Sequence, residues 1–217
     1  MINPNLRSFS LKDDSSYHIR EYKPEDESGW LRCRVLAFLD TSYFDDVYPK
    51  KERYESPAIE LVAESDGIIV GLIDVECEEK PGSICSPSNS LDDHLAGMIW
   101  HLAVHPDYRR IGIATGLIDE AVRRARDIDI ERFEAWTRDD VITRKWYGSQ
   151  GFKLVQSYYH VYLKLSDMET AGICSNSELK PYKVFAHYLG EDREFLSQFS
   201  RVHECVRFDL ILNSIGK

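Results

Sequence analysis

The sequence lacks the patterns that mark metal-binding, secreted and membrane-spanning proteins. Its cysteines are five in number, scattered along 217 residues and never spaced as Cys-x-x-Cys, so we predict no metal site and no disulfide framework. No apolar run comes near the roughly 18 residues of a membrane-spanning helix. No charged-then-apolar leader opens the chain. These absences predict a cytoplasmic protein that does not associate with membranes.

Positive charge is also scarce. Lysine and arginine number 27 against 37 acidic residues, which gives a formal net charge of −10. Nucleic acids are bound through a basic face, so we predict no nucleic-acid partner. The acidic surplus keeps a protein soluble and slightly favours cationic substrates such as amines. The hydrophobic content of 43% is enough for a sizeable core.

One stretch, residues 99–117, organises the chain. The apolar run 98–104 has strand character and is followed by a break at Pro106. Apolar residues then recur at helical spacing, at Leu117, Ile118, Ala121, Val122, Ala125 and Ile128. A loop between a strand and a helix start gathers unpaired main-chain N–H groups at the positive end of the helix dipole. Arg109, Arg110 and the flexible Gly112 lie in this loop, which we therefore expect to bind a pyrophosphate.

This loop resembles that of a known family. The residues from Arg109 to Ala114 match the Gln/Arg-x-x-Gly-x-Gly/Ala signature of the GNAT superfamily, the acyl-CoA-dependent N-acyltransferases. A second match is Tyr147, which stands four residues before Gly151-Phe152 in a segment similar to the family's fourth helix and following strand. The resemblance covers residues 17–165 and implies an α/β fold, with a mixed, twisted sheet and helices on both sides.

Other phosphate-binding loops match this stretch less well. A Walker loop needs Lys-Ser/Thr after its last glycine, whereas Leu117 follows Gly116 here. A dinucleotide-binding loop needs a third glycine and begins directly after the strand, although Glu134 could imitate the ribose-binding acid of that fold. In the remaining alternative the loop only begins a helix and binds no ligand, which would leave the two adjacent arginines without a role.

The domain organisation follows from these matches. We predict a lead-in of residues 1–16, a GNAT core of residues 17–165 and a C-terminal extension of residues 166–217. The extension holds a loop, a strand, a short helix and a final strand, residues 203–212. The resemblance implies that this last strand completes the sheet beside the strand after the fourth helix, so that the rest of the extension is an insertion before it.

The pattern of each segment predicts the remaining elements. The other predicted strands are residues 17–22, 59–64, 68–76, 98–104, 132–137, 152–165 and 182–189, with a hairpin turn at residues 65–67. A first helix after Pro24 is expected to bury Leu31, Val35, Phe38 and Leu39. A short helix is expected within residues 44–54, and a helix capped by Asp139 or Asp140 is expected to end near Gln150.

The resemblance also implies which residues hold acetyl-CoA. They are Leu102, Ala103 and Val104 on a strand expected to splay from its neighbour, followed by Arg109, Arg110, Ile111, Gly112, Ile113, Ala114 and Thr115 in the loop. Tyr147 is the implied proton donor to the departing CoA thiolate, because a phenol stays protonated at neutral pH. The alternative for Tyr147 is packing on the inner face of its helix.

The catalytic base is less well defined. Many family members carry a glutamate where this sequence has Trp100, and an asparagine where it has Asp140, which we interpret as a helix cap. Histidine is a frequent base, so His101 is a candidate, although strand alternation would turn it away from the face of Trp100. Asp74, Glu76 and a water chain are the other candidates.

The predicted function is transfer of an acetyl group from acetyl-CoA to a primary amine by direct attack, without a metal. The alternative is a non-catalytic acyl-CoA-binding sensor or interaction module, which the missing strand glutamate favours and Tyr147 disfavours. The acceptor could be a small molecule or a peptide. Its candidate contacts, for which ordinary packing is the alternative role, are Tyr43, Phe44, Tyr48 and Tyr54. The final strand could also pair across a homodimer.

Overall fold

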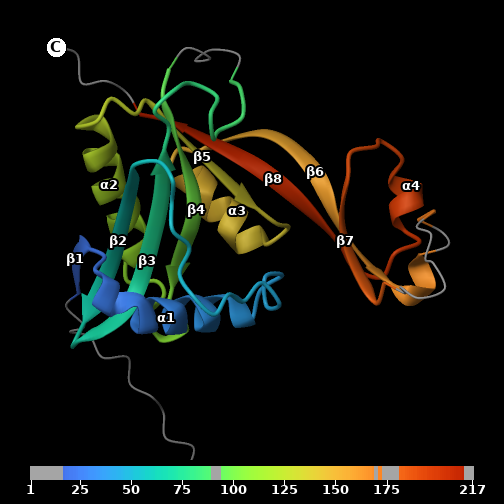
Figure 1. Ribbon diagram of the computed structural model, residues 1–217, viewed down its shortest axis with the longest axis horizontal. Helices are drawn as coiled ribbons and strands as arrows, with labels where there is room; N and C mark the ends of the chain where they lie inside the picture. The colour runs from blue at the N-terminus through green and yellow to red at the C-terminus, as the bar shows by residue number, and fades with distance from the viewer. Residues whose placement is uncertain (1–16, 89–93, 169–170, 173–180, 213–217) are drawn as a thin grey trace, which may run out of the picture.

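One mixed sheet runs through the part of the chain that the computed structural model describes, residues 17–88, 94–168, 171–172 and 181–212 (Figure 1). Its strand order is β1-β2-β3-β4-β5-β8-β6-β7. The strands are β1 (His18–Glu21), β2 (Ala58–Ser65), β3 (Ile68–Cys77), β4 (Ala96–Val104), β5 (Arg132–Thr137), β6 (Lys153–Lys164), β7 (Lys183–Tyr188) and β8 (Val202–Ile211). The predicted lead-in and most of the connection after residue 167 lie outside the described residues.

The pairing directions identify the kind of sheet. Within the described residues, β4 and β5 pair in parallel and every other neighbouring pair is antiparallel. A dinucleotide-binding fold has a mostly parallel sheet, so this alternative is wrong. Glu134, the acid that could have imitated a ribose ligand, is fully buried and accepts hydrogen bonds from Ser86 and Trp136. The predicted mixed α/β fold is confirmed.

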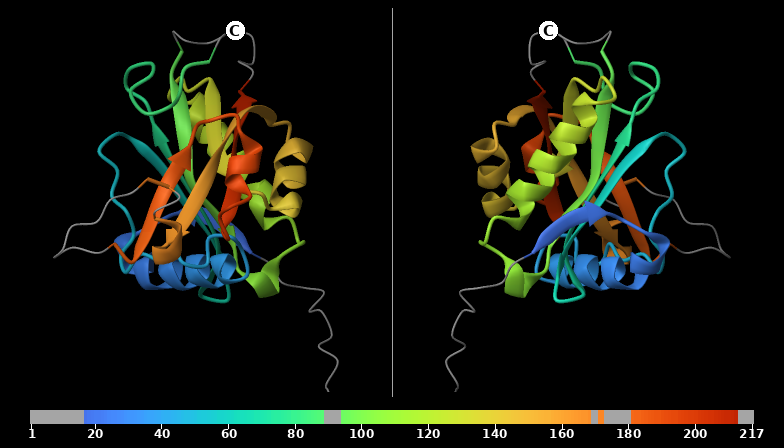
Figure 2. Two further views of the ribbon diagram at one scale, coloured as in Figure 1. Left: turned by 90° about the vertical axis from the view of Figure 1, so that its right-hand side faces the viewer. Right: turned by 90° about the vertical axis from the view of Figure 1, so that its left-hand side faces the viewer.

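Helices cover both faces of this sheet (Figure 2). The helix α1 (Glu27–Leu39) lies on one face, whereas α2 (Ile113–Arg126) and α3 (Val141–Ser149) lie on the other. Consecutive residues of β3 show the two layers, because Leu72 packs in the cluster with Trp30 of α1 and Ile73 packs in the cluster with Leu117 of α2. None of the described helices is both long and apolar enough to cross a membrane.

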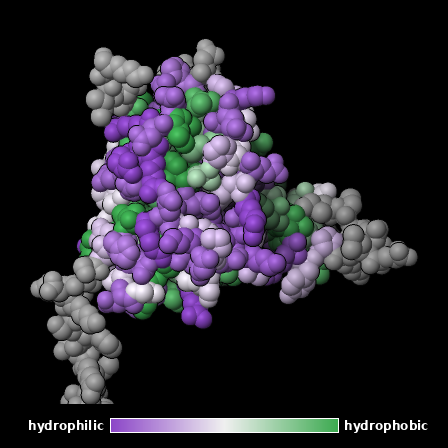
Figure 3. Space-filling model, turned by 60° about the vertical axis from the view of Figure 1, so that its left-hand side comes forward, coloured by the Kyte–Doolittle hydropathy of each residue, from purple (hydrophilic) through white to green (hydrophobic). Residues whose placement is uncertain are grey.

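The outer surface of α2 is hydrophilic (Figure 3). Glu120 pairs there with Arg123 at 2.7 Å and with Arg124 at 2.8 Å. The opposite surface of the helix is buried against the sheet, as the spacing of its apolar residues predicts, although Ile128 lies beyond the helix end and is 46% exposed.

The face that α1 buries only partly matches the predicted one, because Leu31 and Phe38 pack at the edge of the core rather than in its centre. The helix turns Trp30, Cys33, Arg34 and Ala37 into the protein, whereas Leu39 is 58% exposed. Apolar residues occur on several sides of this helix, so their spacing did not single out the buried face. An arginine inside an otherwise apolar face is the unexpected feature.

The short helix predicted within residues 44–54 is absent, because residues 40–57 form turns and extended backbone. Side chains bind the main chain of this segment instead. Thr41 Oγ1 accepts a hydrogen bond from Tyr43 N at 3.1 Å, and Arg138 and Arg201 both donate to the carbonyl oxygen of Ser42. These contacts satisfy groups that a helix would have paired internally.

The two-residue turn between β2 and β3 matches the predicted hairpin. Asp66 and Gly67 both have positive φ angles, 51° and 76°, as a type I′ turn requires. This hairpin pairs β2 with β3, and the other edge of β3 pairs with β4.

The C-terminal part of the chain extends the sheet. The last described strand, β8, lies between β5 and β6, and β7 pairs with the outer edge of β6. The short helix predicted before the final strand is α4 (Arg193–Leu196), which is capped by Asp192. This region projects away from α2 (Figure 1) and has a small core of its own, formed by Val161, Leu163, Met168, Leu196 and Phe199.

Gly71 allows α2 to approach β3 closely, which yields a test of the packing. A Cβ at this position would lie 2.5 Å from Ile113 Cγ2, so we expect Gly71→Ala to lower the free energy of unfolding by about 1–3 kcal/mol through overpacking. Urea denaturation measures the change. Gly148 of α3 has nothing within 4 Å of the added Cβ, so Gly148→Ala is the matched control and should raise stability by about 0.5–1 kcal/mol. Equal stabilities of the two variants would contradict the close approach.

Candidate active site

The strands β4 and β5 part halfway along β4. Their parallel pairing joins Ala96–Ile99 to Arg132–Ala135 and ends there, although β4 continues to Val104. Main-chain groups of residues 100–104 that face β5 therefore have no strand partner. Unpaired main-chain groups cost free energy when they are buried, and an extended ligand can pair with them as an added strand would. This divergence is the one that the resemblance implied.

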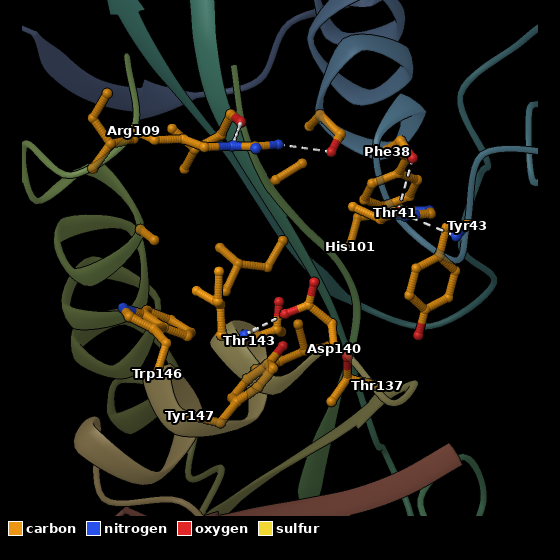
Figure 4. Close-up of a pocket in the computed structure, with 18 of the residues that line it drawn as sticks. Phe38, Thr41, Tyr43, His101, Arg109, Thr137, Asp140, Thr143, Trp146 and Tyr147 are labelled. Atoms are coloured by element: carbon orange, nitrogen blue, oxygen red, sulfur yellow. Dashed lines mark hydrogen bonds between the residues drawn. The ribbon is translucent and has the colours of Figure 1, made fainter. Parts of the chain in front are cut away.

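A cavity of about 660 Å³ opens at this divergence (Figure 4). It extends from the beginning of α2 and α3 on one face of the sheet to the end of α1 on the other. All the residues implied to hold acetyl-CoA line it except Ile111, which is 44% exposed, and Tyr147 and His101 line it as well. The cavity thus brings together the loop, the splayed strand and Tyr147.

The turn before α2 has the geometry of an anion site. Gly112 caps the helix with φ 88°, a conformation that glycine adopts without strain. The first helical hydrogen bond runs from Gly116 N to Gly112 O at 2.9 Å. The N–H groups of the first turn therefore remain available to a ligand. These features fit the pyrophosphate of coenzyme A.

The two arginines of the loop have different surroundings. The guanidinium of Arg109 donates from Nη2 to the carbonyl oxygen of Ala37 at 2.8 Å and from Nε to that of Val104 at 3.4 Å (Figure 4). It therefore ties the loop to the last turn of α1, where carbonyl groups lack helical partners. Arg110 is exposed at the cavity, with φ 68°.

Tyr147 both packs in the core and lines the cavity. Its ring stacks on Phe208, with ring centroids 5.4 Å apart, and meets the edge of Phe152 at 5.0 Å. Burial, together with nearby Tyr43, raises the pKa of the Tyr147 phenol above its ordinary value. The group therefore keeps its proton at neutral pH and can donate it. Both roles considered for this residue are compatible with its position.

The start of α3 confirms the interpretation of Asp140 as a helix cap. Its carboxylate accepts a hydrogen bond from Thr143 N at 2.7 Å. Figure 4 shows Asp140, Thr143 and Tyr147 together on one side of the cavity, and His101 and Phe38 on another.

A β-bulge in β4 changes which residues share a face. The pairing with β3 joins His101 to Asp74 and Ile99 to Val75, so Trp100 is the extra residue. Trp100 Nε1 donates to Glu76 Oε2 at 2.8 Å, while the ring of His101 meets that of Trp30 on the α1 side. The expectation that His101 faces away from Trp100 is therefore wrong, because the bulge turns both residues toward the α1 side.

Protein groups already contact both ring nitrogens of His101. Arg34 Nε donates to Nδ1 at 3.3 Å, and Nε2 lies 3.1 Å from Glu52 Oε2. In the neutral ring Nδ1 is then the acceptor and Nε2 carries the proton. Burial of Glu52 favours its neutral form, but the hydrogen bond and charge of His101, a main-chain hydrogen bond and the charge of Arg34 together lower the pKa of Glu52 to about 2.

The other two candidate bases lie outside the cavity lining. Asp74 is fully buried, with Oδ2 2.9 Å from Lys51 Nζ and a hydrogen bond from Tyr54 at 3.0 Å. Burial raises the pKa of Asp74 despite the charge of Lys51. Glu76 accepts the indole N–H of Trp100.

Residues 40–57 contribute one of the four candidate acceptor contacts. Tyr43 lines the cavity, and its hydroxyl accepts a hydrogen bond from Arg138 N at 2.9 Å. Phe44 and Tyr48 are about half exposed, and Tyr54 binds Asp74.

Other lining residues were missed by the sequence analysis. They include Arg34, Thr41, Asp46, Trp136, Thr137 and Thr143. Arg34 alone has a signal in the sequence, because it stands one turn after Trp30 on the same side of a helix.

Comparison with known proteins agrees with this geometry. The Acetyltransferase (GNAT) family matches residues 18–152, more than half of the chain. The chain belongs to the GNAT acetyltransferase family. Members of this family use acetyl-CoA to acetylate amines.

Solved structures show the same fold. The chain is 14% identical to NAA60 of Arabidopsis thaliana, solved with a bisubstrate analogue, with a TM-score of 0.57 over 90% of this chain and 98% of that one. An N-acetyltransferase of Staphylococcus aureus is 16% identical, with a TM-score of 0.55 over 92% and 100%. The ribosomal-protein-S18-alanine N-acetyltransferase of Escherichia coli is 11% identical, with a TM-score of 0.52 over 93% and 97%.

Glu52 is expected to make stability depend on pH. Its pKa of about 2 in the folded protein lies below the ordinary 4.5, so its charged form stabilises the folded state above pH 4.5. This contribution is lost as the pH falls from 4.5 through about 2. We expect Glu52→Gln to lose less stability than the unsubstituted protein across that window, as measured by thermal unfolding. Glu55→Gln, an exposed carboxylate in the same segment, should follow the unsubstituted protein; identical profiles for all three would contradict the pairing with His101.

Proposed function

We propose that this protein is an N-acetyltransferase that moves the acetyl group of acetyl-CoA to a primary amine. The observation that carries the proposal is a single cavity. It connects the N-terminus of α2, which is suited to bind an anion, with the unpaired main-chain groups of β4, and it extends to the end of α1. Membership of the GNAT family supports it.

The binding of acetyl-CoA follows from these parts. The first-turn N–H groups of α2, with Arg110, take the pyrophosphate. Main-chain groups of Leu102, Ala103 and Val104 pair with the pantetheine arm. Arg109 keeps the loop in place through α1 rather than by touching phosphate.

The chemistry needs three groups. The amine nitrogen forms a bond to the acetyl carbonyl carbon, a main-chain N–H of β4 donates to the carbonyl oxygen, and the carbon–sulfur bond then breaks. Tyr147 gives its proton to the thiolate. The surplus proton of the amine passes to water in the cavity, and water returns a proton to the Tyr147 phenolate. His101 lines the cavity but does not take this proton directly, because both of its ring nitrogens already contact protein groups.

A second candidate function is an acyl-CoA-binding module without catalysis. Trp100 in place of the family's strand glutamate favours it. Release of free thiol from acetyl-CoA in the presence of a panel of amines separates the two functions. Binding of acetyl-CoA without amine-dependent thiol release would support the binding module and contradict the transferase.

Tyr147→Phe tests the assigned proton donor. The ring packing against Phe208 is kept and the hydroxyl is lost, so we expect acetyl-CoA affinity to hold while turnover falls by on the order of a hundredfold or more. Calorimetry measures the affinity and thiol release measures the turnover. Tyr159→Phe, which removes a hydroxyl from β6 outside the cavity lining, is the control. Unchanged turnover in Tyr147→Phe would remove the assignment.

A further inference from the structure

Arg34 is a buried guanidinium at the cavity. It is 2% exposed, its Nε donates to His101 Nδ1 at 3.3 Å, and its Nη1 donates to the carbonyl oxygen of Asp46 at 3.0 Å. The rings of Phe38 and Tyr48 lie 4.9 and 5.1 Å from its Cζ. An arginine stays charged in proteins, and neither hydrogen-bond partner carries a negative charge in these contacts.

No carboxylate among the described residues lies within 4.0 Å of Arg34, and its Nη2 donates no hydrogen bond to them. The buried arginines of β5 and β8 differ, because Arg132 and Arg207 both pair with Asp209, at 2.9 and 2.8 Å. Arg138 is also buried without a carboxylate at this distance, but it does not line the cavity. Arg34 is thus a buried positive charge at the cavity, and its Nη2 is a donor that the described residues leave free.

A buried charge is costly unless a partner of opposite charge compensates it. Cation–π contacts offset only part of this cost. The charge of Glu52 acts on Arg34 from the other side of His101, but Glu52 does not line the cavity. Asp46 does line it, and Arg34 contacts its main-chain carbonyl rather than its carboxylate. The missing partner therefore enters from the cavity, and a carboxylate suits a guanidinium best because its planar oxygens match the fork of N–H donors.

We propose that Arg34 binds a carboxylate of the acceptor, so that the substrates are amines that carry a carboxylate near the amino group. This inference rests on the proposed transferase function. Arg34 lines the same cavity as the splayed part of β4, so a short amino acid held by Arg34 presents its nitrogen toward the acetyl site.

Matched pairs of acceptors test the inference. The kcat/KM for acetylation of each common amino acid is compared with that of its carboxamide at saturating acetyl-CoA, corrected for the fraction of neutral amine. We expect the best amino acid to exceed its carboxamide by at least roughly tenfold, the range of a hydrogen bond to a charged group. In Arg34→Gln the ratio should fall close to one, mainly through KM. Arg32→Gln removes the same charge from the exposed side of α1 and should keep the ratio.

A binding measurement separates this inference from the transferase proposal. The N-acetyl derivative of the preferred amino acid should raise the melting temperature of the unsubstituted protein and not that of Arg34→Gln. Turnover without an acid-over-amide preference would overturn the inference and leave the transferase intact. Arg34-dependent binding without any turnover would support the carboxylate site and overturn the transferase. If Arg34→Gln does not fold, the acid-to-amide ratio of the unsubstituted protein decides alone.

Discussion

The early end of the β4–β5 pairing is the constraint on which the rest of this structure depends. Strands that stay paired leave no space between them, whereas here the partner groups of residues 100–104 are missing on the β5 side. Water in the cavity or an extended ligand can take the place of these partners, because main-chain groups need hydrogen bonds. The cavity lies at this opening, and the turn before α2 and Tyr147 both line it.

The two strands that border the opening, β4 and β5, are each fixed by the strand on their other side. On one edge, β8 pairs with β5, and Arg132, Glu134, Arg207 and Asp209 form a buried network across the two strands. On the other edge, β3 pairs with β4 along its length, apart from the bulge at Trp100. Neither strand can move to close the gap without breaking these contacts.

Local sequence predicted the parts of the site that depend on a few neighbouring residues. The glycine turn before α2, the cap at Asp140 and the hairpin at residues 66–67 each follow from backbone chemistry that a short segment determines. The loop expected to bind phosphate lies in the cavity lining, apart from Ile111, and its binding of phosphate stays a prediction.

Other features depend on partners that are distant in the sequence. Which side of α1 is buried depends on the sheet that it packs against. The bulge at Trp100 depends on the register between β4 and β3. Residues 40–57 form no helix. Arg138 and Arg201, which are distant in the sequence, donate hydrogen bonds to the carbonyl oxygen of Ser42 in this segment. Spacing within one segment contains no record of such contacts. The sequence could place Arg34 on the side of Trp30, but its contact with His101 and the orientation of His101 emerged only with the fold.

The place of β8 in the sheet has a consequence for how the molecule assembles. The strand is the last one described, yet it separates β5 from β6 and carries half of the buried Arg–carboxylate network. During synthesis β5 and β6 emerge earlier and must wait with open edges that could pair wrongly with each other or with another chain. When β8 inserts between β5 and β6, the contacts that form join residues far apart in the sequence. Such long-range contacts slow folding. A nascent chain that stops before β8 leaves the part of the sheet that borders the cavity without the strand that fixes β5.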